Sequence, residues 1–117
     1  LRLLVTEDPC GSASALIAGS DLVVGTRSLL LLEACLLGRP VLSYQPGLRA
    51  RDVLRSNEWG WSRAVYHQEE LERALDEELF DLSARAARRQ ALDRIQLPQG
   101  ATECVVDLLL ARERLRC

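Results

Sequence analysis

The chain has 117 residues, of which 48% are hydrophobic and 27% are charged, and its formal net charge is −2. A chain of this length fits one domain that buries a core of its own. Its near-neutral charge argues against a nucleic-acid binder, which usually carries a basic excess, and its hydrophobic content argues against disorder. All 15 basic residues are arginine, so this chain cannot supply the lysine of a Schiff base or of a P-loop.

The first half of the chain predicts short strands that alternate with helices. Three apolar runs bounded by turn residues are typical of buried strands, namely Leu1–Thr6, Leu22–Val24 and Val41–Ser43. Small and apolar residues at 12–18 predict a short helix, and the sequence SLLLLEACLL at 28–37 predicts a longer one. Ser28 can cap the start of this second helix, and Gly38 and Pro40 fit its end.

The second half of the chain predicts one more strand, at Ala64–Tyr66, together with several helices. The helices are expected at 48–55, 68–79, 81–95 and 101–115, with a turn at 57–61 and a break at 97–100. The acidic residues between Glu69 and Glu78 are interpreted as a solvated helix face. This order of elements predicts an α/β fold, a Rossmann-like three-layer domain with a short parallel sheet and C-terminal helices.

Cysteine, histidine and tryptophan give little sign of a metal or base-stacking site. The four cysteines form no C-x-x-C pair, and His67 is the single histidine, so zinc binding is not expected. Cysteines in this pattern predict a reduced, cytoplasmic location. We interpret His67 as a surface or capping residue and Cys35 as a buried apolar one. Trp59 and Trp61 are expected to pack at a helix–loop junction. No segment is long and apolar enough to span a membrane.

The loop Gly25-Thr26-Arg27-Ser28 is the first candidate binding element. It leaves a predicted parallel strand and enters a helix, and α/β sheets bind ligands at that edge. The start of the helix offers free N–H groups and partial positive charge, which suit phosphate. Gly25 allows close approach of the backbone, and Thr26 and Ser28 can add hydroxyl donors. The alternative is that Ser28 is only a cap and Gly25 only a turn.

Glu33 is the second candidate, because it is the one charged residue in an otherwise apolar or small run at 29–37. A helix that is apolar on all sides is expected to be buried, and a buried carboxylate needs a partner. Its two oxygens suit the neighbouring 2′- and 3′-hydroxyls of a ribose. The alternative is a carboxylate that faces solvent or pairs with Arg27 or Arg39.

A second loop, which follows the strand at 41–43, is expected at the same edge of the sheet. Tyr44, Gln45 and Arg49 are its candidate contacts to sugar or phosphate. Solvated surface arginines are the more frequent case, and this alternative stays open for Arg49 and Arg51.

The stretch GSDLVVGTRSLLLLEACLLGRPVLSYQPG resembles the nucleotide-binding half of GT-B-type glycosyltransferases. It is also similar to the non-hydrolysing UDP-N-acetylglucosamine 2-epimerases. The matching positions are Asp21, Gly25, Ser28, Glu33-Ala34, Gly38 and Pro40, and the resemblance extends over residues 20–79. The epimerases usually show Ser-Gly-Gly and paired acids where this chain has Thr-Arg-Ser and a single Glu33, which favours the transferase.

The resemblance implies that loop 25–28 meets the donor diphosphate and that Glu33 binds the ribose. It implies that residues 1–117 are the C-terminal Rossmann-like domain of a longer two-domain protein, in agreement with the absence of Met at position 1. The acceptor site and catalytic base would lie on the missing N-terminal domain, so the catalytic residues are unknown and the chain alone is expected to be inactive. The substrate would be a UDP-type nucleotide-sugar, with no cofactor and no metal at the sugar site.

Three functions therefore stand side by side. The first is the nucleotide-sugar-binding half of a glycosyltransferase-like enzyme, and the second is a 2-epimerase-like domain. The third is a non-catalytic α/β interaction module whose C-terminal helices, rich in Ala, Arg and Leu, contact a partner. The expected partners are the nucleotide-sugar and the missing domain, without nucleic acid. Peripheral membrane association of the parent protein and a homodimer stay open.

Overall fold

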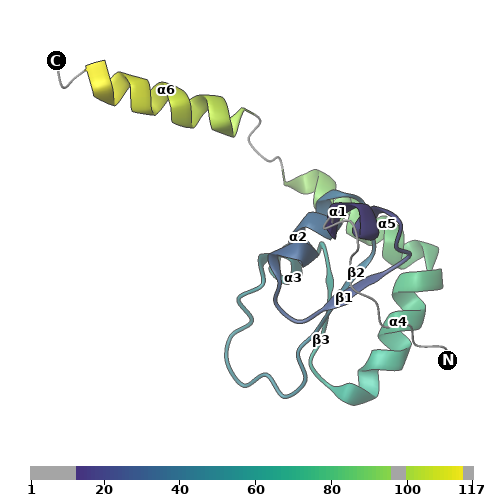
Figure 1. Ribbon diagram of the computed structural model, residues 1–117. Helices are drawn as coiled ribbons and strands as arrows, with labels where there is room; N and C mark the ends of the chain where they lie inside the picture. The colour runs from purple at the N-terminus through teal and green to yellow at the C-terminus, as the bar shows by residue number, and fades with distance from the viewer. Residues whose placement is uncertain (1–12, 96–99, 115–117) are drawn as a thin grey trace.

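A three-stranded parallel sheet forms the centre of the molecule, as the computed structural model shows for residues 13–95 and 100–114 (Figure 1). Its strands are β1 (Val23–Gly25), β2 (Val41–Tyr44) and β3 (Arg63–Val65), which lie in the order β1-β2-β3. The register pairs Val23 with Val41 and Ser43 with Ala64. Each of the three strands was predicted to within two residues, whereas the strand predicted at Leu1–Thr6 lies outside the described residues.

One face of the sheet is covered by α1 (Ala13–Ala18) and α2 (Leu29–Leu36). The core on this side consists of buried side chains from both helices, from β2 and from the segment before β3, namely Ile17, Leu31, Ala34, Cys35, Val41 and Trp61. Ala91 and Leu92 of α5 (Leu82–Arg94) pack against its margin. Cys35 is buried, as predicted.

The other face of the sheet is covered by α4 (Leu71–Phe80), which follows a 3₁₀ turn at Gln68–Glu70. Leu42, Val65 and Ala74 form the buried core on this side. Successive side chains of a strand point to opposite faces, so Val41 joins the first core and Leu42 the second. The sheet lies between two helical layers, which confirms the predicted α/β class and a small Rossmann-like domain.

The ends of α2 follow the predicted capping chemistry. The Ser28 hydroxyl accepts a hydrogen bond from the backbone N–H of Leu30 at 3.1 Å. After the helix, Gly38 has a φ of 75°, a conformation that side chains with a Cβ rarely adopt. These two residues fix the length of α2 and the point where its first turn faces the loop after β1.

The predicted burial of α2 on all sides is wrong. Only the side formed by Leu31, Ala34 and Cys35 is buried, while Leu29 is 82% exposed and Leu30 44% exposed. The reason is that the sheet, α1 and α3 contact the helix without covering the side that carries Leu29 and Leu30. Composition gives the average polarity of a helix but not the number of its neighbours.

The helix predicted at 48–55 is also wrong. Residues 48–54 form an irregular loop, and a short helix, α3, spans only Arg55–Glu58. The carboxylate of Asp52 accepts hydrogen bonds from the backbone N–H of Leu54 and from the amide of Asn57. Such local bonds from Asp to the backbone compete with helix formation.

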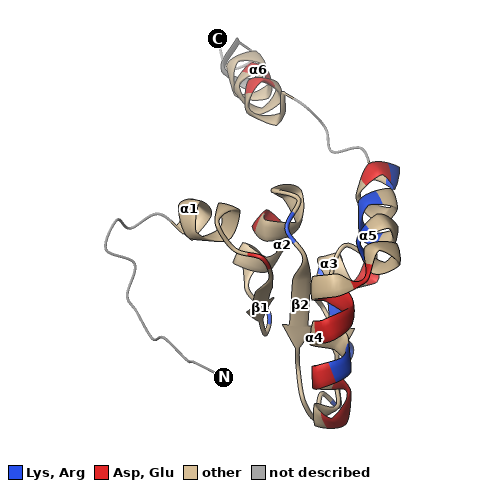
Figure 2. Cartoon of the chain, turned by 90° about the vertical axis from the view of Figure 1, so that its right-hand side faces the viewer, with Lys and Arg blue, Asp and Glu red and all other residues tan. Residues whose placement is uncertain are grey.

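The C-terminal part consists of α5 and α6 (Ala101–Arg114), both predicted (Figure 2). The side chain of Asp81 caps α5 by accepting from the backbone N–H of Ser83 at 2.8 Å. The apolar side chains on α6 are exposed, namely Val105, Val106, Leu108, Leu109 and Leu110. The break predicted at 97–100 falls mostly on residues outside the described ones. None of the described helices has the length and apolarity needed to cross a lipid bilayer.

Candidate functional site

Two loops meet at the carboxyl edge of the sheet, where β1 and β2 end side by side. The hydroxyl of Ser43 in β2 donates a hydrogen bond to the carbonyl of Thr26 in the first loop, at 2.8 Å. The amide Nε2 of Gln45 in the second loop donates in turn to the Ser43 hydroxyl, at 3.0 Å. A single serine side chain thus joins the two loops.

Between these loops lies an open hollow with a cavity volume of about 450 Å³. Four of the predicted site residues line it, namely Thr26, Arg27, Gln45 and Arg49. Both arginines are exposed, and among the described residues neither forms an ion pair. Gln45 is only 4% exposed, and its Oε1 has no hydrogen-bond partner within the described part of the chain. The hollow therefore offers two guanidinium groups, and an unpaired acceptor is buried in its wall.

Asp52 fixes the loop that forms the far wall of this hollow. Its carboxylate accepts hydrogen bonds from the Tyr66 hydroxyl at 2.6 Å, the Asn57 amide at 2.8 Å and the Leu54 N–H at 2.9 Å. Burial tends to raise the pKa of Asp52, but these bonds and one from Gln45 outweigh it and lower the pKa to about 2. The hydrogen bond from the Tyr66 hydroxyl to Asp52, together with burial, raises the pKa of Tyr66 to about 12.

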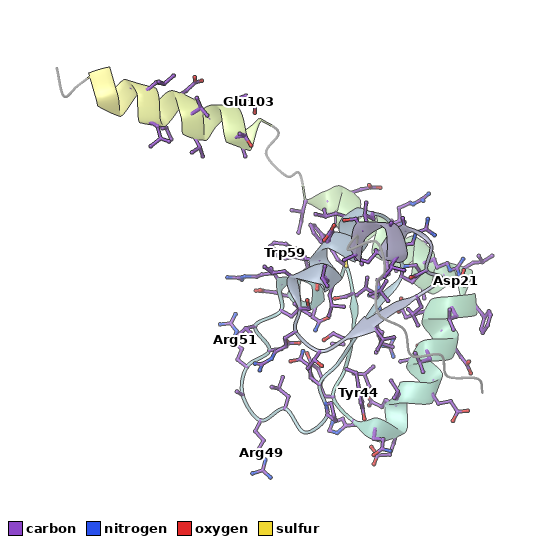
Figure 3. All side chains as sticks on the ribbon, in the orientation of Figure 1. Asp21, Tyr44, Arg49, Arg51, Trp59 and Glu103 are labelled. Carbon is purple, nitrogen blue, oxygen red and sulfur yellow. The ribbon has the colours of Figure 1, made fainter. Side chains whose placement is uncertain are left out.

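Three other predicted site residues lie around the hollow rather than in it. Ser28 uses its hydroxyl to cap α2. Gly25 ends β1 without a positive φ, and a Cβ at this position would lie 2.9 Å from Cδ2 of the buried Leu31. A side chain at position 25 would therefore force the packed Leu31 side chain of α2 to shift. Tyr44 packs on the opposite face of the sheet, against the core formed with α4 (Figure 3).

Glu33 lies on the side of α2 that faces α1. Its carboxylate accepts a hydrogen bond from the hydroxyl of Ser14 in the first turn of α1, at 2.5 Å. The side chain is partly buried, and in the described part of the chain it pairs neither with Arg27 nor with Arg39. It does not line the hollow between the loops. The predicted ribose ligand and the predicted phosphate ligands therefore lie at separate points around the start of α2.

Sequence reasoning missed the residues that hold the site together. Ser43 belongs to an apolar strand, where a hydroxyl needs a partner, and this alone could have marked it. Asp52 stands two residues before the N–H it binds, which is the spacing of an Asx turn. The contact from Tyr66 to Asp52 joins residues 14 positions apart and has no local signal.

The remaining predicted residues take structural places. The rings of Trp59 and Trp61 pack in a tilted arrangement with centroids 4.8 Å apart, and the Trp61 indole donates to the carbonyl of Ala91, which confirms a packing role. His67 is exposed before α4, also as predicted. Within residues 13–95 and 100–114, no three His, Cys, Asp or Glu side chains gather in a way that could hold a metal ion.

Comparisons of the chain with protein-family models, with curated proteins and with solved structures found no match. The geometry of the hollow is thus the basis on which its function is argued.

Proposed function

We propose that this chain is the nucleotide-sugar-binding half of a glycosyltransferase-like enzyme that uses a UDP-type donor. The observation that carries the proposal is the hollow at the carboxyl edge of the sheet. There Arg27 and Arg49 have no anionic partner among the described residues, and the buried Oε1 of Gln45 has no donor. A diphosphate supplies the anionic partner of the two arginines, and a ligand hydroxyl that enters beside Gln45 supplies the donor to its Oε1.

The start of α2 extends this arrangement. Its N-terminus carries partial positive charge next to the loop at 26–28, which favours the same diphosphate. Glu33 stands four residues after the first residue of α2, so its Cα lies about 6 Å along the helix axis from the start. A nucleoside that extends from the diphosphate along α2 toward α1 would bring its ribose hydroxyls to this carboxylate, with Ser14 as a neighbouring partner.

In this proposal the chain binds and orients the donor while another domain supplies the acceptor site and the catalytic base. Arg27, Arg49 and the start of α2 stabilise the negative charge that develops on the leaving diphosphate. No metal or cofactor has a role at the sugar. The proposal includes a cytoplasmic location for the parent protein, without nucleic acid as a partner.

Calorimetry of the full-length protein with UDP tests the proposal directly. We expect Glu33→Ala and Arg49→Gln each to weaken UDP binding at least tenfold, which corresponds to about 1.4 kcal/mol. Arg51→Gln is the matched control, because Arg51 contacts Glu58 instead of lining the hollow, and it should leave the affinity unchanged. If all three variants bind UDP as tightly as the wild type does, the proposed site is refuted.

A non-catalytic interaction module is the second candidate, and the exposed apolar side chains of α2 and α6 favour it. It predicts no heat with any nucleotide, together with a stable dimer in analytical ultracentrifugation. The epimerase alternative is separated by incubation of the full-length protein with UDP-N-acetylglucosamine. If the 2-epimer appears, the function proposed for this binding site changes from glycosyl transfer to epimerisation.

A further inference from the structure

A second cavity, of about 490 Å³, lies at the opposite edge of the sheet from the hollow already described. The residues Asp21 before β1, Arg39 before β2 and Trp61 before β3 line it, which marks it as the amino edge. Figure 3 labels Asp21 at this edge. The helices α4 and α5 close its other side with Glu78 and the arginines of α5. Its volume falls within the range of about 300–1,000 Å³ typical of small-molecule sites.

Glu78 is the most unusual residue in this cavity, because sequence analysis placed it on a solvated helix face and the structure buries it completely. Its Oε1 accepts a hydrogen bond from Nη2 of Arg88 at 2.9 Å. Its Oε2 and the Nε of Arg88 have no hydrogen-bond partner among the described residues. A buried ion pair that is only half satisfied is unfavourable unless another group completes it. Both atoms are shielded from solvent in the wall of the cavity, so a group that completes the pair can reach them only when these two side chains turn toward the cavity.

The charge of the cavity favours an anion. Four guanidinium groups line it, those of Arg39, Arg85, Arg88 and Arg89, against the carboxylates of Asp21 and Glu78. In the described part of the chain only Arg88 is ion-paired among the four. The C-terminus of α2 adds partial negative charge near Arg39, which leaves the arginines of α5 as the centre of the positive charge (Figure 2).

Cys35 also lines the cavity but does not add a nucleophile to it. Burial, opposed in part by the charge of Arg88, raises the pKa of its thiol to about 12. The thiol therefore stays protonated at neutral pH, and the thiolate needed for attack is scarce. The cavity is equipped to bind a ligand and not to form a covalent bond with one.

We propose that this cavity binds a small phosphate monoester that carries hydroxyl groups, such as a phosphorylated polyol or sugar. Arg85 and Arg89 bind the phosphate. When the ligand binds, the Glu78 and Arg88 side chains turn toward the cavity, and a ligand hydroxyl donates to Oε2 of Glu78 and accepts from Nε of Arg88, so that the buried pair is completed. The proposal uses none of the residues of the carboxyl-edge hollow and stands independently of the nucleotide-sugar function.

Titration of the full-length protein with glycerol 3-phosphate tests this site, with the fluorescence of Trp61 in the cavity wall and calorimetry as readouts. We expect the exposed pair R85Q/R89Q to weaken binding at least tenfold. Arg49→Gln, the same change at the other edge, should leave this affinity unchanged while it weakens UDP binding. Inorganic phosphate, which lacks the hydroxyls, should bind at least fivefold more weakly than glycerol 3-phosphate.

Two results would overturn the proposal. One is glycerol 3-phosphate binding that is absent at millimolar concentration or equal in wild type and R85Q/R89Q, with thermal melts showing that the variant is folded. The other is equal affinity for inorganic phosphate and glycerol 3-phosphate, which would remove the role of Glu78. Loss of UDP binding in Arg49→Gln with retained glycerol 3-phosphate binding would separate the two sites.

Discussion

The two edges of the sheet are built by different means. At the carboxyl edge, two loops that directly follow β1 and β2 are joined by the Ser43 hydroxyl, and residues close in sequence line the hollow. At the amino edge, the cavity is made by the C-terminal end of α2, by the segments before the strands and by α4 and α5, so that Arg39 and Arg89 line one cavity from positions far apart in the chain. The first site depends on topology, and the second depends on where α5 docks.

The largest expected effect comes from the buried pair at the amino edge. Glu78→Ala leaves Arg88 beside the cavity without its carboxylate, and we expect it to lower the free energy of unfolding by about 3 kcal/mol. Glu72→Ala, an exposed change on the same helix, should alter it by less than about 0.5 kcal/mol. Urea denaturation measures both. Equal small effects would mean that α5 does not dock as described, and the comparison of the two edges would fail.

Next in size is the residue that fixes the loop at the carboxyl edge. Asp52→Ala removes the acceptor of the hydrogen bonds from Leu54, Asn57 and Tyr66, and we expect a loss of about 2 kcal/mol in the free energy of unfolding. UDP binding should weaken as well, because Arg49 lies in the same loop. Asp76→Ala on the exposed side of α4 serves as the control. A loss of stability without any loss of UDP affinity would mean that this loop takes no part in UDP binding.

A smaller effect is expected where β1 meets α2. Gly25→Ala would bring a Cβ to 2.9 Å from the buried Leu31, so we expect a loss of about 1 kcal/mol in stability from overpacking. Gly19→Ala is matched to it, because a Cβ there meets no atom closer than 3.6 Å. Thermal melts of the two variants compare them. If Gly25→Ala is as mild as Gly19→Ala, the glycine is not needed for this contact.

The smallest effect is a dependence of stability on acid. The folded pKa of Asp52, about 2, lies below the ordinary value of 3.8, so its contribution is complete above pH 4. It should be lost as the pH falls from about 4 to about 2, because the carboxylate must then be protonated in the folded state. Denaturation of wild type and Asp52→Asn across this range measures it. The difference between them should shrink toward pH 2, and a constant difference would contradict the assignment.

The sequence predicted the carboxyl edge of the sheet better than the amino edge. The strands and the caps of α2 at Ser28 and Gly38 were predicted, because their signals lie within a few residues. The loop at 48–54 was mistaken for a helix, because apolar and basic residues there fit a helical period while Asp52 binds the backbone instead. Four residues of the hollow were identified because parallel topology alone brings their loops together.

The burial of two side chains, Leu29 and Glu78, was not predicted by the local pattern. The apolar Leu29 is exposed and the charged Glu78 is buried, which is the reverse of what their polarity predicts. Both outcomes depend on neighbours supplied by distant parts of the chain. The neighbours of α2 leave Leu29 uncovered, and Glu78 contacts Arg88 of α5 in the wall of the cavity. The amino-edge site was invisible to sequence reasoning for this reason.

The hydroxyl of Ser43 has one more consequence for the carboxyl edge. Since it holds the carbonyl of Thr26 and is itself held by Gln45, neither loop can shift without disturbing the other. A ligand that arrives there meets a platform that is already in place, and little conformational entropy has to be lost on association. The fixed spacing between the two loops then determines which ligands fit at this edge, because the loops do not move to accommodate a ligand of another size.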